Sequence, residues 1–362
     1  MFLWIVRSIA LLLVTVTLLP LLRTGFWFVR GWDMPRMQIA VFQLVLICAI
    51  LGAIGFVEQQ TELWCWLGVL LVACIWQGAH VIRFTPLWTT EVAASKSTQD
   101  ALKLMIVNVD FSNRHYSRVA TEIQSLSPDL LALIEINKDW LQGLSDLRQA
   151  YPHRHEEIAE DGVGMVLWSK LPLTGARTRF MVEDRRPSIW ASLDFRGHRI
   201  GFVCVHPTPP GLKDSTGEGR RNSRVRDAEL VLIAREIANF KDQAWLVAGD
   251  FNDVAWSHTT RLFKRISGLN DPRVGRSFMG TFHSRSPLLR VPLDHLFVSD
   301  GFEILSLSRH KTSGSDHFAV LGELSLRRSE GVTPKPQGDD QQEANQLIAE
   351  GVEDAAARDV SA

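Results

Sequence analysis

The segment LVAGDFN, Leu246–Asn252, decides how the rest of this 362-residue chain is interpreted. Its apolar run predicts a buried strand, and Asp250 and Asn252 stand where that strand ends. A second segment, SGSDHFAV, brings Asp316 and His317 to the edge of another apolar run. Either segment alone is a weak signal, because Asp and Asn after a strand are common in turns. The two segments together, in this order, are a strong signal.

Further strands are bounded by polar residues in the same way. LKLMIVNVDFSN predicts a strand that ends at Asn108, and DLLALIEIN predicts one that ends at Glu135. RIGFVCVHPTPP runs into His206, and VPLDHLFVS opens a strand with Asp294. Carboxylates, amides and imidazoles gathered at strand ends suit metal-assisted attack of water on a phosphate ester.

In this arrangement the chain resembles the endonuclease/exonuclease/phosphatase superfamily. That group includes pancreatic-type deoxyribonucleases, exonuclease III-like repair nucleases, neutral sphingomyelinases and inositol polyphosphate 5-phosphatases. The resemblance covers roughly Lys103–Leu326, its most specific motifs are GDFN and SDH, and it looks most like a membrane-anchored bacterial branch. It implies an α/β fold, a four-layer αββα sandwich of two mixed sheets.

The resemblance also implies a divalent-metal site. Glu135 is the expected metal ligand, with Asn108 and Asp316 close by. Mg²⁺ prefers oxygen ligands and needs only one or two carboxylates, and Mn²⁺ would suit the same oxygens. No Cys/His cluster has the ligand spacing of a zinc site.

Five further residues take catalytic roles if the resemblance holds. Asp250 and Asn252 would orient the attacking water. His317, held by Asp294, would act as base or charge stabiliser. His206 would donate a hydrogen bond to a non-bridging phosphate oxygen.

The chain departs from the family pattern at two positions. In the deoxyribonuclease branch a second glutamate pairs with the histidine that matches His206, and Ile134 stands here in place of a usual glutamine. Four acidic residues are available for the first role: Glu156, Glu157, Glu160 and Asp161. Because none of them is a clear match, the protonation state of His206 stays open.

The first 90 residues have a different composition. Three apolar stretches, at roughly 2–22, 38–57 and 63–82, each have about the 20 residues that a bilayer-spanning helix needs. Seven of the twelve tryptophans lie in this region, mostly at the ends of the stretches, as in an interfacial aromatic belt. The first stretch could instead be a signal peptide, but it lacks a small-x-small cleavage site. We therefore expect three retained helices that anchor the chain in a lipid bilayer.

These features predict four parts of the chain. They are a transmembrane region (1–84), a linker (85–101), a catalytic domain (102–327) and a disordered acidic tail (328–362). The tail has eight acidic and two basic residues and no aromatic residue from Ser329 onward, so it has little to bury.

Charges flanking the apolar stretches predict the orientation. The loop after the first stretch carries Arg23, Arg30 and Arg36, and the loop after the second carries only acidic charges. The positive-inside rule then places the first loop and the catalytic domain in the cytoplasm. The resemblance to a membrane-anchored bacterial branch implies that the membrane is a bacterial inner membrane.

A basic cluster after His206 has two interpretations. Arg220, Arg221 and Arg224 either belong to a solvated loop and helix start or bind the phosphates of nucleic acid or anionic lipid. The sequence thus predicts a membrane-anchored phosphoesterase, with a nuclease-like hydrolase first. A phospholipid or sphingolipid phosphodiesterase or phosphatase is the second enzyme hypothesis, and a catalytically silent membrane scaffold is an alternative from another class. No protein partner can be inferred.

Overall fold

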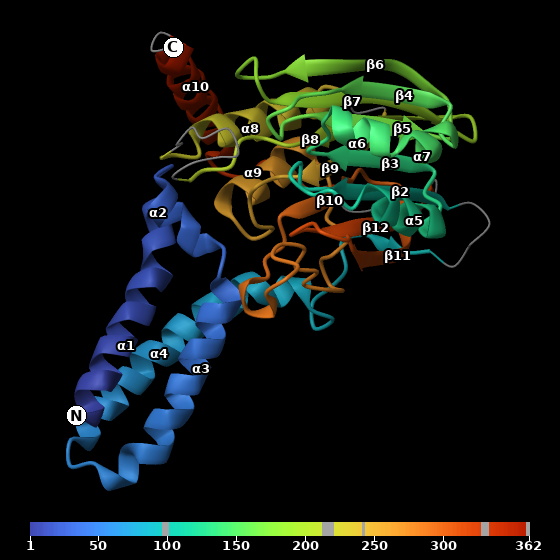
Figure 1. Cartoon of the computed structure of the whole chain (residues 1–362). Coiled ribbons are helices and arrows are strands. Elements are labelled where there is room, and N and C mark those ends of the chain that lie inside the picture. Colours follow the sequence, from blue (N-terminus) through green and yellow to red (C-terminus); the bar gives the residue numbers. More distant parts are fainter. Residues whose placement is uncertain (96–100, 212–220, 241–242, 327–332, 360–362) are drawn as a thin grey trace.

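The computed structural model describes residues 1–95, 101–211, 221–240, 243–326 and 333–359. Two β-sheets packed face to face form a domain from which a bundle of three long helices projects (Figure 1). The amino terminus lies at the far end of the bundle, and the last helix, α10 (Asp340–Asp359), lies on the domain.

The strands form one sheet of seven and one of five. The seven-stranded sheet has the order β1-β11-β12-β2-β3-β5-β4, and the five-stranded sheet has the order β10-β9-β8-β7-β6. Strand bounds in the first sheet are β1 (Ala93–Ala94), β11 (Phe302–Lys311), β12 (Phe318–Leu326), β2 (Leu102–Asn108), β3 (Leu130–Ile134), β5 (Met165–Ser169) and β4 (His153–Glu157). Strand bounds in the second are β10 (Asp294–Val298), β9 (Ala244–Asp250), β8 (His198–Val205), β7 (Pro187–Phe195) and β6 (Leu173–Phe180).

Helices cover the outer face of each sheet. The first sheet is covered by α5 (Tyr116–Leu126), α6 (Lys138–Gly143) and α7 (Ser145–Gln149), and the second by α8 (Arg224–Ala238) and α9 (His258–Ser267). Both strand faces are therefore apolar: in β2, Leu104 and Ile106 enter the core between the sheets, and Met105 and Val107 pack under the helices. The expected four-layer αββα sandwich of two mixed sheets is confirmed.

The N-terminal bundle, residues 2–84, contains three helices long and apolar enough to cross a membrane, at Phe2–Leu22, Arg36–Phe56 and Gln60–Phe84. They are built from α1 (Phe2–Leu18), η1 (Leu19–Leu22), α3 (Arg36–Ala53), η3 (Ile54–Phe56), α4 (Gln60–Val81) and η4 (Ile82–Phe84). Short turns α2 (Trp27–Arg30) and η2 (Gly31–Asp33) join the first two at the end nearest the domain (Figure 1). The loop after the first helix and the β-sheet domain thus lie at the same end of the bundle.

The predicted linker is partly wrong. Val92 packs into the core between the sheets, β1 pairs in parallel with β11, and Glu91 forms an ion pair with Lys264. Residues 91–94 are therefore part of the domain, because this short apolar stretch completes a sheet edge that the sequence pattern did not reveal.

The tail also differs from the expectation of disorder, since α10 packs along α8. Ala344 is fully buried, and Leu347 and Ile348 pack on the same cluster. At Gly351 a Cβ atom would lie 2.3 Å from the Cβ of Ala228, so this glycine lets the two helices approach closely. Small and aliphatic residues at helical spacing, without any aromatic residue, are sufficient to dock this acidic helix.

Candidate active site

Strand pairing brings the predicted polar residues to one place between the two sheets. Parallel β2 and β3 align Asn108 with Ile134, the residue before Glu135. In the other sheet, Asp294 of β10 pairs directly with Asp250 of β9. Parallel strands end at a common edge, so the groups that follow them converge without any long loop.

Asn108 connects the acidic groups of the two sheets. Its Nδ2 donates to Glu135 Oε1 at 3.0 Å and to Asp250 Oδ2 at 3.2 Å, and its Oδ1 accepts from the Asp110 N–H. Glu135 Oε2 also accepts from the Phe111 N–H at 3.2 Å. Burial raises the pKa of Glu135 despite these donors. Its carboxylate therefore lies in a pocket where a cation would be favourable.

A hydrogen-bonded histidine connects the two aspartates. His317 Nδ1 lies 2.8 Å from Asp294 Oδ2, and its Nε2 lies 3.6 Å from Asp250 Oδ2. Burial alone would lower the pKa of His317, but the carboxylates of Asp294 and Asp250 raise it to about 10. Burial raises the pKa of Asp250, with the negative charges of Asp294 and Glu135 adding to the effect and His317 opposing it. His317 is therefore a cation at neutral pH, and the pKa of Asp250, raised to about 7, makes its carboxyl group a better proton acceptor than an ordinary aspartate.

His206 has the opposite charge state. Burial, together with the positive charges of Arg186 and His317, lowers the pKa of His206 well below its usual range. Its Nε2 lies 3.9 Å from Glu135 Oε1, and its Nδ1 has no hydrogen-bond partner among the described residues. His206 is thus a neutral imidazole with hydrogen-bonding capacity left for a ligand.

The turn after β9 fixes Asn252. Its backbone N–H donates to Asp250 Oδ1 at 2.9 Å, and its side-chain Nδ2 donates to the Pro207 carbonyl at 2.9 Å. At Gly249, with φ of 149°, a Cβ would lie 2.0 Å from the Val205 carbonyl oxygen. Only glycine therefore allows the GDFN strand to lie this close to β8 beside His206.

Two groups of residues are candidates for a cation. Ligand atoms of Asp250, Asp294 and His317 lie within 4.8 Å of one another. However, a protonated imidazole that donates to Asp294 has no lone pair to offer a metal. Glu135, whose side chain is 20% exposed, carries the carboxylate better suited to a hard cation.

The other predicted residues lie in different surroundings. Asp316 is half-buried, its negative charge helps raise the pKa of His317, and its carbonyl accepts from the Ser284 N–H. Arg220 lies outside the described residues. The Arg221 carbonyl accepts from the Trp27 N–H, and the Arg224 guanidinium lies 3.5 Å from Glu350 of α10. The Arg224 side chain is thus paired with α10, whereas the contact of Arg221 with α2 is made by its backbone.

None of the four acidic residues considered as a partner of His206 is among its contacts. Glu156 pairs with Arg148, and Glu157 accepts from Thr178. Glu160 and Asp161 form ion pairs with Lys138 and Arg185, respectively.

Several supporting residues were not predicted from the sequence. Ser315 Oγ donates to the Asn108 carbonyl and accepts from the His317 N–H, which ties the SDH segment to β2. The Phe282 ring lies 5.0 Å from that of His317, and Arg226 Nη1 donates to the Asn252 carbonyl at 2.6 Å. Ser315 lies within the SGSDH segment and could have been proposed from the sequence. Phe282 and Arg226 could not, because they lie far along the chain from the motifs they support.

Comparisons with known proteins agree with this fold. The sequence pattern of the Endonuclease/Exonuclease/phosphatase family matches residues 105–317. No curated protein sequence matches the chain.

Among solved structures, D. rerio TDP2 complexed with a single-strand DNA product superposes with a TM-score of 0.51 at 15% identity, over 63% of this chain and 100% of that one. An endonuclease/exonuclease/phosphatase from Bacteroides vulgatus gives 0.50 at 17%, over 63% and 99% of the two chains. A third, from Beutenbergia cavernae DSM 12333, gives 0.50 at 18%, over 63% and 72%. At these identities the likeness shows a shared fold.

The sequence pattern covers more than half of the chain, and the two-sheet architecture agrees with it. This chain belongs to the endonuclease/exonuclease/phosphatase family.

Proposed function

We propose that the chain is a membrane-anchored, divalent-metal-dependent hydrolase of phosphodiester bonds. One observation carries the proposal: three carboxylates, those of Glu135, Asp250 and Asp294, lie together, and His317 is in direct contact with the last two. The raised pKa of Glu135 and of Asp250 is the expected response of buried carboxylates that need further positive charge.

Glu135 would hold Mg²⁺ or Mn²⁺, with Asp316 and the amide oxygen of Asn108 as further ligands. Bound there, such a cation would polarise a phosphoryl oxygen and neutralise charge on the leaving group. Buried oxygen donors without a cysteine or zinc-type histidine cluster fit a hard cation of this kind.

The remaining residues have roles in water attack. The water oxygen attacks phosphorus, the ester P–O bond breaks, and the water proton passes to Asp250. Asn252 keeps Asp250 in place through its backbone N–H. The imidazolium of His317, fixed by Asp294, stabilises the growing negative charge on the phosphate. Neutral His206 donates a hydrogen bond to a non-bridging oxygen.

We propose that the three N-terminal helices span a bacterial inner membrane. Their length and apolar composition support the anchor. An excess of arginine in the loop after the first helix favours a cytoplasmic domain. Reporter fusions after Thr90 test the orientation: alkaline phosphatase activity, without fluorescence from a cytoplasm-only reporter, would reverse it.

Nucleic acid is the first substrate candidate, because a protein of the same fold is complexed with single-strand DNA product. A lipid phosphodiester is the second, and a loop favours it. Leu288 and Leu289 are 79% and 63% exposed, and Gln38 Nε2, in the first turn of α3, donates to the carbonyls of Leu288 and Arg290 at 3.0 and 3.1 Å. Two exposed leucine side chains, held beside the end of a membrane-spanning helix, are in a position to contact the surface of a bilayer.

The test uses the full-length chain in nanodiscs. Single-stranded DNA and RNA oligonucleotides, phosphatidylcholine, sphingomyelin and inositol phosphates would be incubated with Mg²⁺, Mn²⁺ or EDTA. We expect hydrolysis of at least one phosphodiester, lost with EDTA and with Glu135→Gln. No hydrolysis of any substrate, or hydrolysis that resists EDTA, would contradict the proposal.

The same preparation separates the two substrates. A Leu288→Ser/Leu289→Ser variant should lose activity on lipid in vesicles if lipid is the substrate, while it keeps activity on a soluble short-chain lipid. Cleavage of oligonucleotides should not change in this variant if nucleic acid is the substrate.

A further inference from the structure

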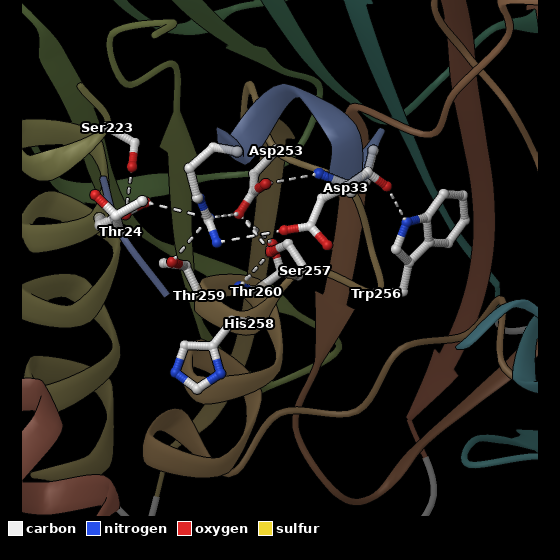
Figure 2. A network of polar contacts seen from close by, with 12 residues as sticks. Thr24, Asp33, Ser223, Asp253, Trp256, Ser257, His258, Thr259 and Thr260 are labelled. Carbon is white, nitrogen blue, oxygen red and sulfur yellow. Dashed lines mark hydrogen bonds and ion pairs between the residues drawn. The ribbon is translucent and has the colours of Figure 1, made fainter. Parts of the chain in front are cut away.

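A second buried polar cluster lies where the turns α2 and η2 meet the domain (Figure 2). We call it the anchor cluster; its members are Arg30, Asp33, Arg36, Arg226, Asp227 and Asp253. None of these six side chains is more than 9% exposed. The three arginines balance the three aspartates, so the buried cluster carries no net charge.

Arg30 joins the N-terminal bundle to this cluster. Its Nη2 lies 3.4 Å from Asp253 Oδ2 and 3.8 Å from Asp227 Oδ1, and it donates to Thr259 Oγ1 at 3.1 Å. Its Nη1 lies 3.5 Å from Asp33 Oδ2. Burial alone would lower the pKa of Arg30, but Asp227, Asp253 and Asp33 raise it above its ordinary value. The guanidinium is therefore always charged and holds together acidic groups of the bundle and of the domain.

The cluster reaches the candidate active site through two backbone groups. Asp253 directly follows Asn252, and its carbonyl accepts from His295 Nε2 at 2.8 Å. Arg226 Nη1 donates to the Asn252 carbonyl at 2.6 Å, while its Nε and Nη2 donate to Asp227 Oδ1 at 3.0 and 2.8 Å. Arg226 and His295 thus hold the backbone of the GDFN turn and of the residue after it. Arg30 contacts Asp227 and Asp253, the two aspartates that also contact Arg226.

Loss of Arg30 would leave Arg226 as the one arginine, among the described residues, within ion-pair distance of Asp227 and Asp253. Arg226 Nη2 already lies 3.6 Å from Asp253 Oδ2. A shift toward that carboxylate would weaken the hydrogen bond to the Asn252 carbonyl and move the turn that carries Asp250. Displacement of a reacting group by about 1 Å can reduce turnover by about 10²-fold.

We propose that Arg30 is a positioning residue that couples the N-terminal bundle to the GDFN turn, so that the bundle is required for the geometry of the active site as well as for anchoring. This inference rests on the proposed phosphodiesterase function. It also implies that a fragment starting near Ala101 is incomplete, because among the described residues such a fragment keeps Arg226 as the one basic side chain paired with Asp227 and Asp253.

Arg36 offers a matched control. It is equally buried in the same cluster, and its guanidinium bonds Asp33 Oδ1 at 2.6 and 3.2 Å and Gln77 Oε1 at 2.9 Å. No contact links it to Asp227, Asp253 or Arg226 among the described residues. Arg36→Met therefore removes a buried charge from the anchor cluster without removing the contacts that lead to the active site.

The test compares Arg30→Met, Arg30→Lys and Arg36→Met in the full-length chain in nanodiscs, with bis(p-nitrophenyl) phosphate and Mg²⁺ as the probe. We expect Arg30→Met to lower kcat by roughly tenfold or more with little change in KM. Arg30→Lys should recover part of kcat, because its ammonium group keeps the positive charge. Recovery should be incomplete, because the ammonium cannot make the several hydrogen bonds of the planar guanidinium. Arg36→Met should keep kcat within about twofold of the wild-type value, even if it lowers Tm as much as Arg30→Met does.

A second variant addresses the mechanism. Arg30→Met/Asp253→Asn removes the carboxylate that would attract Arg226, so kcat should rise above that of Arg30→Met alone. A purely structural role for Arg30 would make the double variant worse than either single one.

Hydrogen–deuterium exchange gives a readout that does not depend on turnover. Peptides covering residues 249–253 should exchange faster in Arg30→Met than in Arg36→Met. Unchanged kcat and unchanged exchange in Arg30→Met, with an active wild type, would overturn the positioning role alone. An inactive wild type would overturn the proposed function and this inference with it. If Arg30→Met loses protection from exchange throughout the chain, that variant is unfolded, and the kcat of Arg30→Lys then decides whether Arg30 positions the turn.

Discussion

Two buried polar clusters lie on either side of the GDFN turn, and they differ in charge balance. In the anchor cluster three arginines meet three aspartates, each within ion-pair distance of an opposite charge. In the candidate active site Glu135, Asp250 and Asp294 lie together, and His317 is the cation that contacts the two aspartates among the described residues. One oxygen of Asp294 has no partner among the described residues. The first cluster is complete as protein, and the second calls for positive charge from a ligand. One fold can thus contain an ionic cluster with equal numbers of positive and negative charges, which holds parts of the structure together. It can also contain a second cluster with an excess of carboxylates, which suits binding and catalysis.

Removal of single groups from the unbalanced cluster should have the largest effects. Asp250→Asn and His317→Ala should each lower turnover by at least about 10²-fold, since one accepts a proton and the other stabilises charge. The two losses should be non-additive, because both groups act in one hydrogen-bonded unit. Steady-state kinetics of the single and double variants measure this, and a double variant that shows the full product of both losses would contradict the shared role.

Removal of Asp33 or Arg36 from the balanced cluster, in contrast to removal of Arg30, should mainly reduce stability. Asp33→Asn leaves Arg36 with Gln77 as its remaining side-chain partner and should cost about 3 kcal/mol of the free energy of unfolding. Adding Arg36→Met should cost less than the sum of the two single changes, since the pair acts together. Thermal unfolding in detergent measures this. A double variant whose loss of unfolding free energy equals the sum of the two single losses would show that the two charges are independent.

Helix α10 provides a more exposed counterpart, with ion pairs that depend on pH. A hydrogen bond from Arg265 lowers the pKa of Asp340, and one from His258 lowers the pKa of Glu343. Carboxyl groups whose pKa is lowered in the folded state stabilise it above their unfolded pKa, and this contribution is lost as pH falls through the folded pKa. Protection of α10 from hydrogen exchange should therefore be constant at neutral pH and fall below about pH 4.

A control for that experiment is available in the same helix. Ala344 and Leu347 hold α10 through apolar contacts that do not titrate. Partial protection should therefore remain below pH 4, and a complete release of α10 already near pH 6 would contradict the assignment to the carboxyl groups.

The smallest effect is expected at the basic residues near α8. The guanidinium of Arg224 lies 3.5 Å from Glu350 of α10, so this side chain is already paired within the protein. Charge reversal at Arg224 should change oligonucleotide affinity by less than about twofold and leave the log–log salt slope within 0.9 of the wild type, the change expected for one phosphate contact. A larger loss of slope would restore these arginines as a nucleic-acid contact.

The residues that the sequence proposed for the site lie together in the structure, because each stands at one end of a continuous apolar strand. Asn108, Glu135, Asp250 and Asp294 needed only the parallel and antiparallel pairing of neighbouring strands to meet. The local signals were sufficient there, because the side chains follow directly from strand register.

The anchor cluster could not be predicted in this way. Arg30 and Asp253 are 223 residues apart, and each looks like an ordinary surface charge in its own segment. The docking of α10 could not be predicted for a related reason: composition alone does not show that Ala344 and Gly351 face α8. Burial of charge is a property of the assembled structure, and it becomes visible only when both partners are placed.

The charge imbalance of the active site is tested most directly by calorimetric titration of the full-length chain with Mg²⁺ or Mn²⁺. The wild type should bind a divalent cation at one saturable site, Glu135→Gln should bind it much more weakly, and Arg36→Met, which disturbs only the balanced cluster, should bind it like the wild type. Equal affinity in the wild type and Glu135→Gln, or no binding by the wild type, would contradict the account.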